Sequence, residues 1–78
     1  MISLNELTPG DSATIEQIGD LPQAFRESLY SIGLLPGASV KLIRRAPLGD
    51  PLQIEVHNTQ LTIRMIDAKQ ISICQDDR

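Results

Sequence analysis

The sequence contains few of the residues from which metal sites, disulfides and stacking surfaces are built. It has one cysteine, Cys74, one histidine, His57, no tryptophan, and only two aromatic residues, Phe25 and Tyr30. A single cysteine excludes an internal disulfide and fits a reducing cytoplasm. One cysteine and one histidine cannot form a closed tetrahedral metal site within one chain. Two aromatic rings are too few for a site that stacks bases or proline-rich peptides.

Positive charge is also scarce. Seven Lys and Arg residues stand against ten Asp and Glu residues, which gives a net charge of −3 and a pI of about 4.8. A general nucleic-acid binder usually has a strong basic excess. No apolar run approaches the ~18 residues that span a bilayer, and the first residues lack the basic and apolar segments of a signal peptide. We therefore expect no nucleic-acid partner, no direct membrane insertion and a cytoplasmic location.

The chain lacks the motifs of common catalytic and nucleotide-binding sites. It contains neither G-x-x-x-x-G-K-[ST] nor G-x-G-x-x-G. Strand alternation places His57 and Cys74 on outward faces, and no spacing brings a serine, a histidine and an aspartate together. We expect no catalytic residue, no metal ligand and no cofactor within one chain, and a metal site shared across a dimer stays open.

Hydrophobic residues make up 41% of the sequence, which is enough to form the core of one small domain, residues 1–78. The segment Ser3 to Leu7 carries a Ser-x-x-Glu capping box, which predicts a single helical turn. Ser12 to Gly19 alternates in polarity and predicts a strand, with a bulge near Gln17 where the alternation breaks.

A short amphipathic helix is predicted next. Asp20 is expected to cap it, and Gln23 stands at the capping-box position. The residues that share its apolar face, and that we expect to enter the core, are Leu21, Phe25, Leu29 and Ile32.

The end of this helix is the most strongly marked feature of the sequence. Gly33 follows the last apolar helical position, where a residue at positive φ is needed. Leu34 is then expected to pack back on Leu29, a contact that often accompanies a glycine stop. Pro36-Gly37 supplies the central pair of a type II turn, so the chain should reverse sharply into the next strand.

The rest of the chain predicts short strands separated by turns. Strands are expected over residues 38–46, 52–57, 61–65 and 71–73, with a hairpin turn at Asn58, one helical turn over 67–70 and a frayed charged tail over 75–78. Two prolines stiffen the loop over 46–51. Five short strands, with one short α-helix between the first and second, predict a mainly β fold. The expected architecture is a small SH3-like β-barrel covered at one end by the helix.

Several side chains are expected on the surface of rigid turns. Tyr30 and Leu35 flank the helix stop, and Leu48 stands at the tip of the proline-braced loop. Such apolar residues are candidates for a partner's pocket, although Leu48 could instead fold back and cap the barrel. A second group could be either a solvated face or a patch for an acidic partner: Lys41, Arg44, Arg45 and Arg64.

Two motifs together resemble the FeoA family, small cytoplasmic ferrous iron transport proteins of bacteria. They are L-Y-S-I-G-L-L-P-G over Leu29 to Gly37 and A-P-L-G-D-P over Ala46 to Pro51. The likeness extends from Leu4 to Ile73. It also includes the opening Leu4-x-x-Leu7-x-Pro9-Gly10 and the single residues Arg26, Arg64, Ala68 and Ile71.

The resemblance implies an SH3-like barrel and a non-enzymatic accessory role in ferrous iron uptake. The implied partner is the cytoplasmic part of FeoB, a membrane GTPase transporter. A second small Feo protein and a weak homo-oligomer are further partners that the resemblance leaves open. Together with the exposed turns, it gives eight expected partner-binding residues: Arg26, Tyr30, Leu35, Pro36, Pro47, Leu48, Gly49 and Asp50.

An alternative of a different class is a metal-responsive regulatory module. The same barrel resembles the C-terminal domain of iron-dependent repressors, although this chain lacks DNA-binding helices. Such a module would bind Fe²⁺ through carboxylate and imidazole ligands, or through a cysteine shared across a dimer. The candidate ligands are Asp50, Glu55, His57 and Cys74.

Overall fold

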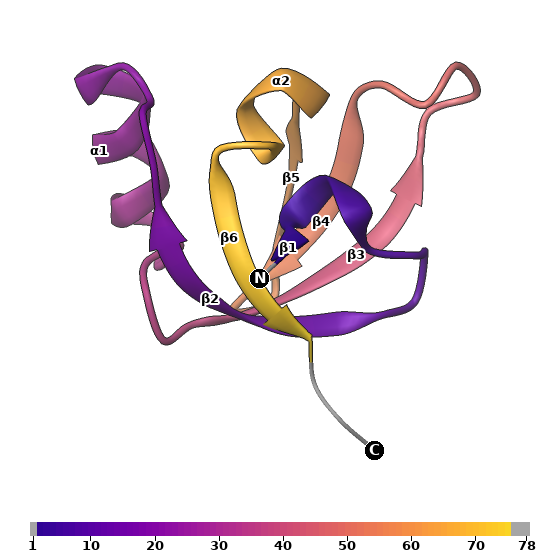
Figure 1. The fold of residues 1–78 in the computed structure, drawn as a ribbon, viewed down its shortest axis with the longest axis horizontal. Coiled ribbons are helices and arrows are strands. Elements are labelled where there is room, and N and C mark those ends of the chain that lie inside the picture. Colours follow the sequence, from indigo (N-terminus) through magenta and orange to yellow (C-terminus); the bar gives the residue numbers. More distant parts are fainter. Residues whose placement is uncertain (1, 76–78) are drawn as a thin grey trace.

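The computed structural model of the protein describes residues 2–75 as one curled antiparallel sheet with short helices at its ends (Figure 1). The strand order in the sheet is β1-β6-β2-β3-β4-β5. Along the chain the elements are β1 (Ile2–Ser3), η1 (Leu4–Glu6), β2 (Ser12–Ile18), α1 (Gln23–Ser31), β3 (Ser39–Arg45), β4 (Leu52–Val56), β5 (Thr59–Ile63), α2 (Met65–Ala68) and β6 (Ile71–Gln75).

The prediction of a mainly β barrel-like fold is confirmed, with one more strand than expected. The additional strand is β1, whose two residues pair with the middle of β6. A two-residue strand is too short to produce a visible alternation pattern, which is why the sequence did not reveal it. The one predicted helix, α1, lies between the first two long strands, β2 and β3. No helix among residues 2–75 is long and apolar enough to cross a bilayer.

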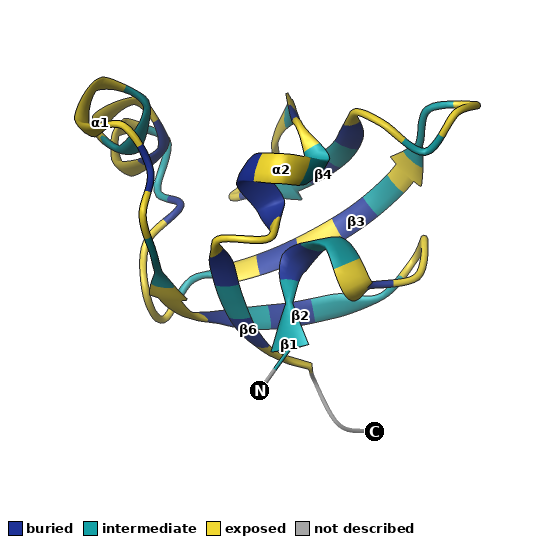
Figure 2. Cartoon of the chain, turned by 45° about the horizontal axis from the view of Figure 1, so that its top comes forward, coloured by how far each residue is buried: buried dark blue, intermediate teal, exposed yellow. Residues whose placement is uncertain are grey.

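The core lies inside the curl of the sheet, where buried side chains alternate with exposed ones along the strands (Figure 2). In β4, for example, Leu52, Ile54 and Val56 are fully buried. This alternation is what a half-buried strand requires, because successive side chains point to opposite faces. The largest fully buried side chains are Leu4, Leu7, Ile15, Leu29, Leu34, Val40, Leu42, Leu52, Ile54, Val56, Ile71 and Ile73.

Two irregularities in strand pairing help the sheet to curl. The pairing of β2 with β6 shifts between Ile15 and Gln17, which confirms the predicted bulge. The pairing of β3 with β4 shifts between Leu42 and Arg44, which was not predicted. A bulge adds a residue to one strand, bends it and increases the local twist.

The predicted start of α1 is wrong. Asp20 does not cap the helix; the N-cap position is Pro22, and it has no capping side-chain hydrogen bond. Gln23 instead donates through its side-chain amide to Glu27, 3.2 Å away. The local capping signal is overridden because Leu21 is buried in the core and Gly19 is tied to the Gln70 carbonyl at 2.7 Å.

The predicted end of α1 is confirmed in detail. Gly33 has a φ of +93°, and its N–H donates to the Tyr30 carbonyl at 3.0 Å. The Leu34 N–H donates to the Leu29 carbonyl at 3.0 Å, and both leucine side chains lie in the core. These two bonds satisfy carbonyls that a helix end otherwise leaves unpaired, in the arrangement of a Schellman motif.

The following turn also agrees with the prediction. Gly37 has a φ of +95°, and the Ala38 N–H donates to the Leu35 carbonyl at 3.0 Å. Positive φ at the third position is the mark of a type II turn. The Gly37 N–H then donates to the Ile15 carbonyl at 2.7 Å, which anchors the turn on β2.

The second half of the chain needs three corrections. The hairpin turn at Asn58 is confirmed, but His57 shares its positive φ, so β5 begins at Thr59. Met65 does not continue that strand but begins α2, so the helical turn expected over 67–70 lies two residues earlier. Gln75, expected in the frayed tail, is the last residue of β6; the rest of that tail, 76–78, lies outside the described residues.

Candidate partner-binding surface

The two turns that the sequence singled out lie at opposite ends of the molecule. In Figure 1 the turn after α1 is at the lower left, and the loop between β3 and β4 is at the upper right. The eight expected partner-binding residues therefore do not form one patch. We call the first group, Tyr30, Leu35 and Pro36, the helix-stop surface. We call the second group, Pro47, Leu48, Gly49 and Asp50 together with the neighbouring Ile66, the loop surface.

Leu48 is the most exposed large hydrophobic residue among those described, with 96% of its surface accessible. The loop that carries it is closed by two backbone bonds, from the Gly49 N–H to the Ala46 carbonyl at 2.7 Å and from the Ala46 N–H to the Pro51 carbonyl at 3.1 Å. The interpretation in which Leu48 folds back to cap the barrel is therefore wrong. The loop holds the leucine away from the core and in water.

Ile66 is the second such residue, at 65% exposure, and the sequence analysis missed it. It lies on α2, next to the loop at the top of Figure 1. A signal was available, because Ile66 breaks the alternation of the preceding strand pattern. Asp50 joins the two elements: its carboxylate accepts a hydrogen bond from the Met65 N–H at 2.8 Å. Leu48 and Ile66 therefore lie on elements that are fixed to each other.

An ion pair also joins α2 to Arg64, the residue at its N-cap position. The Arg64 guanidinium donates to the Asp67 carboxylate at 3.0 Å, and the Arg64 side chain remains 72% exposed while that of Asp67 is 11% exposed. Asp67 is the one buried charged residue among those described. A buried carboxylate needs such a partner, so Arg64 contributes to the structure of α2 as well as to the surface.

The bond between Asp50 and Met65 leads to a stability prediction. Asp50→Ala is expected to lower the free energy of unfolding by about 1 kcal/mol, the typical cost of losing a helix-capping side chain. Asp50→Asn is the matched control, because its amide oxygen can still accept from Met65, and its loss should be smaller. Urea unfolding followed by circular dichroism measures both. Equal losses for the two variants would mean that the hydrogen bond contributes little.

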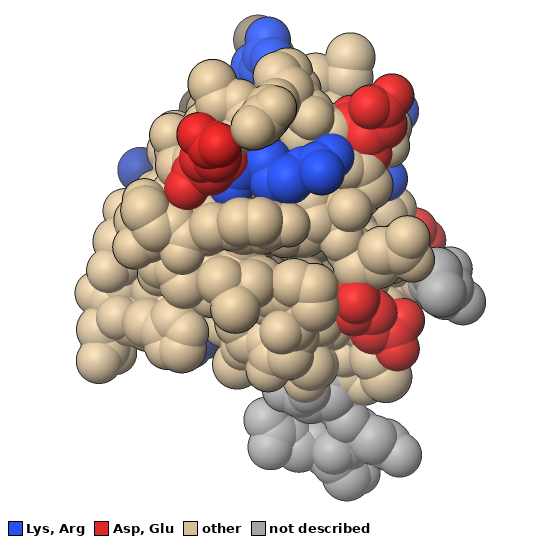
Figure 3. Space-filling view, turned by 90° about the vertical axis from the view of Figure 1, so that its left-hand side faces the viewer, with Lys and Arg blue, Asp and Glu red and all other residues tan. Residues whose placement is uncertain are grey.

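The helix-stop surface is smaller in exposed apolar area but has no charge. Tyr30 and Leu35 are 43% and 41% exposed, and no charged residue occurs between Ser28 and Val40. Figure 3, which views the molecule from the side of α1, shows mostly uncharged atoms over the lower half of this face, with acidic atoms at its right. This surface is a second candidate for contact with an uncharged partner surface.

Arg26, predicted to bind a partner, is used within the fold. Its Nη2 donates to the Gly19 carbonyl at 2.8 Å and to the Leu21 carbonyl at 3.4 Å, and the residue is half-buried. These bonds hold the segment that precedes α1. A role for Arg26 in partner binding stays a prediction.

Arg45 is likewise a structural residue. Its Nη2 donates to the carbonyl of Asn5 and, at 2.8 Å, to the carbonyl of Leu7, which fastens η1 to the end of β3. The two partners are about forty residues earlier in the sequence. No local pattern could have predicted this contact.

Arg44 belongs to a ladder of polar side chains across three strands. Its Nε donates to the Gln53 side chain at 2.9 Å, and the Gln53 amide donates to the Gln60 side chain at 2.8 Å. With Arg45 and Arg64 also engaged, three of the four predicted basic residues are bound within the chain. These bonds agree better with a solvated face, in which the cations have partners within the chain, than with a patch for an acidic partner.

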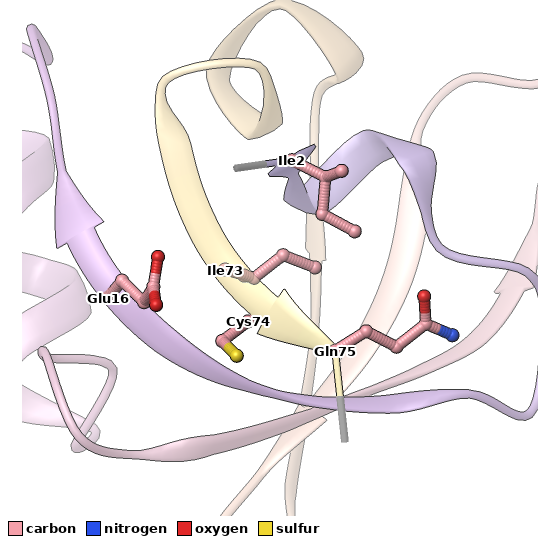
Figure 4. Close-up of a pocket in the computed structure, with 5 residues that line it drawn as sticks. All are labelled: Ile2, Glu16, Ile73, Cys74 and Gln75. Atoms are coloured by element: carbon pink, nitrogen blue, oxygen red, sulfur yellow. The ribbon is translucent and has the colours of Figure 1, made fainter. Parts of the chain in front are cut away.

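His57 and Cys74 are both exposed, as expected. His57 nevertheless has a close neighbour: a Cβ placed on Gly33 would lie 2.9 Å from its Nε2. Cys74 lines a hollow of about 520 Å³ between β1, β6 and β2, with Ile2, Glu16, Ile73 and Gln75 (Figure 4). Among residues 2–75, no group of three or more His, Cys, Asp or Glu residues is arranged to hold a metal ion.

The curled sheet, the single helix between its long strands and the exposed turns define the class of small SH3-like β-barrels. A FeoA from Stenotrophomonas maltophilia, solved with zinc and described as a procaryotic SH3 domain protein, has the same fold. It is 28% identical, with a TM-score of 0.81 over 97% of this chain and 96% of that one. Within this class the chain belongs to the FeoA domain family, whose model matches residues 2–74. The resemblance noted in the sequence is thereby confirmed.

Two further relatives connect the family with iron transport. A FeoA protein from Chlorobium tepidum is 36% identical, with a TM-score of 0.89 over 95% of this chain and 70% of that one. A fusion of Fe(2+) transport protein A with the Fe(2+) transporter FeoB, from Porphyromonas gingivalis, is 29% identical over 70 residues. That match covers 90% of this chain but spans only 8% of the fusion protein. FeoA relatives are thus associated with ferrous iron transport.

Proposed function

We propose that the protein is a non-enzymatic, cytoplasmic accessory subunit of ferrous iron uptake, which binds the cytoplasmic part of a FeoB-like GTPase transporter. The fusion protein of Porphyromonas gingivalis supports this partner, because it combines a segment similar to this chain with a FeoB transporter. Fusion keeps two modules at high effective concentration, an arrangement that favours modules that act together.

The observation that carries the proposal is the loop surface. Leu48 and Ile66 expose 96% and 65% of their surface, more than any other large hydrophobic residues described. Burying one such side chain in a partner is favourable by about 1.5–3 kcal/mol. The two residues lie on elements joined by the hydrogen bond between Asp50 and Met65, and exposed apolar side chains held on a fixed surface mark sites of protein contact. Tyr30 and Leu35 are already more than half covered, so burying them in a partner would contribute less binding free energy.

Binding of the purified cytoplasmic domain of the FeoB-like transporter from the same organism tests the proposal. Leu48→Glu is expected to weaken binding at least tenfold, because a carboxylate would replace the apolar contact. Its melting temperature should match the wild type, since the side chain makes little contact with its own chain. Ile66→Glu should act in the same direction.

Leu35→Glu, at the opposite end of the molecule, is the control and should leave binding unchanged. If Leu35→Glu abolished binding and Leu48→Glu did not, the helix-stop surface would be the site instead. Absence of binding by the wild-type protein, measured by calorimetry with and without a GTP analogue, would refute the proposed partner.

A further inference from the structure

We draw no further inference here: the strongest candidate, the pocket of about 280 Å³ between the start of α1, the end of β5 and the start of α2, carries no proposal, because nothing in the part of the chain that the structure describes shows which ligand or partner would occupy it.

Discussion

Gly33→Ala is expected to lower the free energy of unfolding by about 2–5 kcal/mol. About 1–2 kcal/mol comes from forcing a residue with a Cβ into the left-handed region, where Gly33 has a φ of +93°. A further ~1–3 kcal/mol comes from overpacking, because the new Cβ would lie 2.9 Å from Nε2 of His57 and closer still to its Cδ2. Urea unfolding of the two proteins measures the difference.

The two causes can be separated with His57→Gly as a second background. This change removes the ring, and glycine tolerates the positive φ that His57 has in the hairpin turn. In that background Gly33→Ala should cost only the backbone part, about 1–2 kcal/mol. Equal costs in both backgrounds would show that the ring relaxes without strain. A wild-type stability for Gly33→Ala would show that the helix does not end at this residue.

Leu34→Ala is expected to be about as severe, at about 2–5 kcal/mol. Leu34 is fully buried in the core, so its removal leaves a cavity as well as losing apolar burial. A chain of 78 residues has a total stability of about 4–12 kcal/mol. The variant therefore loses a large share of the stability of the domain, and its urea midpoint should fall sharply.

The neighbouring residue provides a matched control. Leu35 has the same side chain one position later but is 41% exposed, so Leu35→Ala should cost less than about 1 kcal/mol. Similar losses at the two positions would contradict the assignment of Leu34 to the core and Leu35 to the surface. The pair thus tests the helix stop independently of Gly33.

The sequence predicted the helix stop well because its signals are local. Gly33, Pro36 and Gly37 each restrict the backbone directly, and a few residues decide the geometry. The predicted start of the same helix was wrong. Asp20 has a good local capping pattern, but contacts with residues far away in the sequence determine where the helix begins. The bond between Gly19 and Gln70 and the burial of Leu21 fix the chain before the helix can begin there.

The candidate site was predicted only in part, again because local signals can be read from the sequence and contacts between distant residues cannot. Leu48 was visible as an apolar residue in a loop of turn formers, and the structure places it in water. Ile66 became part of the same surface only through the contact between Asp50 and Met65, fifteen residues apart. The guanidinium groups of Arg26 and Arg45 looked available in the sequence because their carbonyl partners are set by the fold.

The hydrogen bond between Asp50 and Met65 has a consequence for the speed and cost of association. Because it holds the loop and α2 in one arrangement before any partner arrives, little conformational entropy is lost when the two meet. A preorganised surface of this kind should associate without a slow rearrangement step, and its affinity should depend mainly on how long the complex lasts.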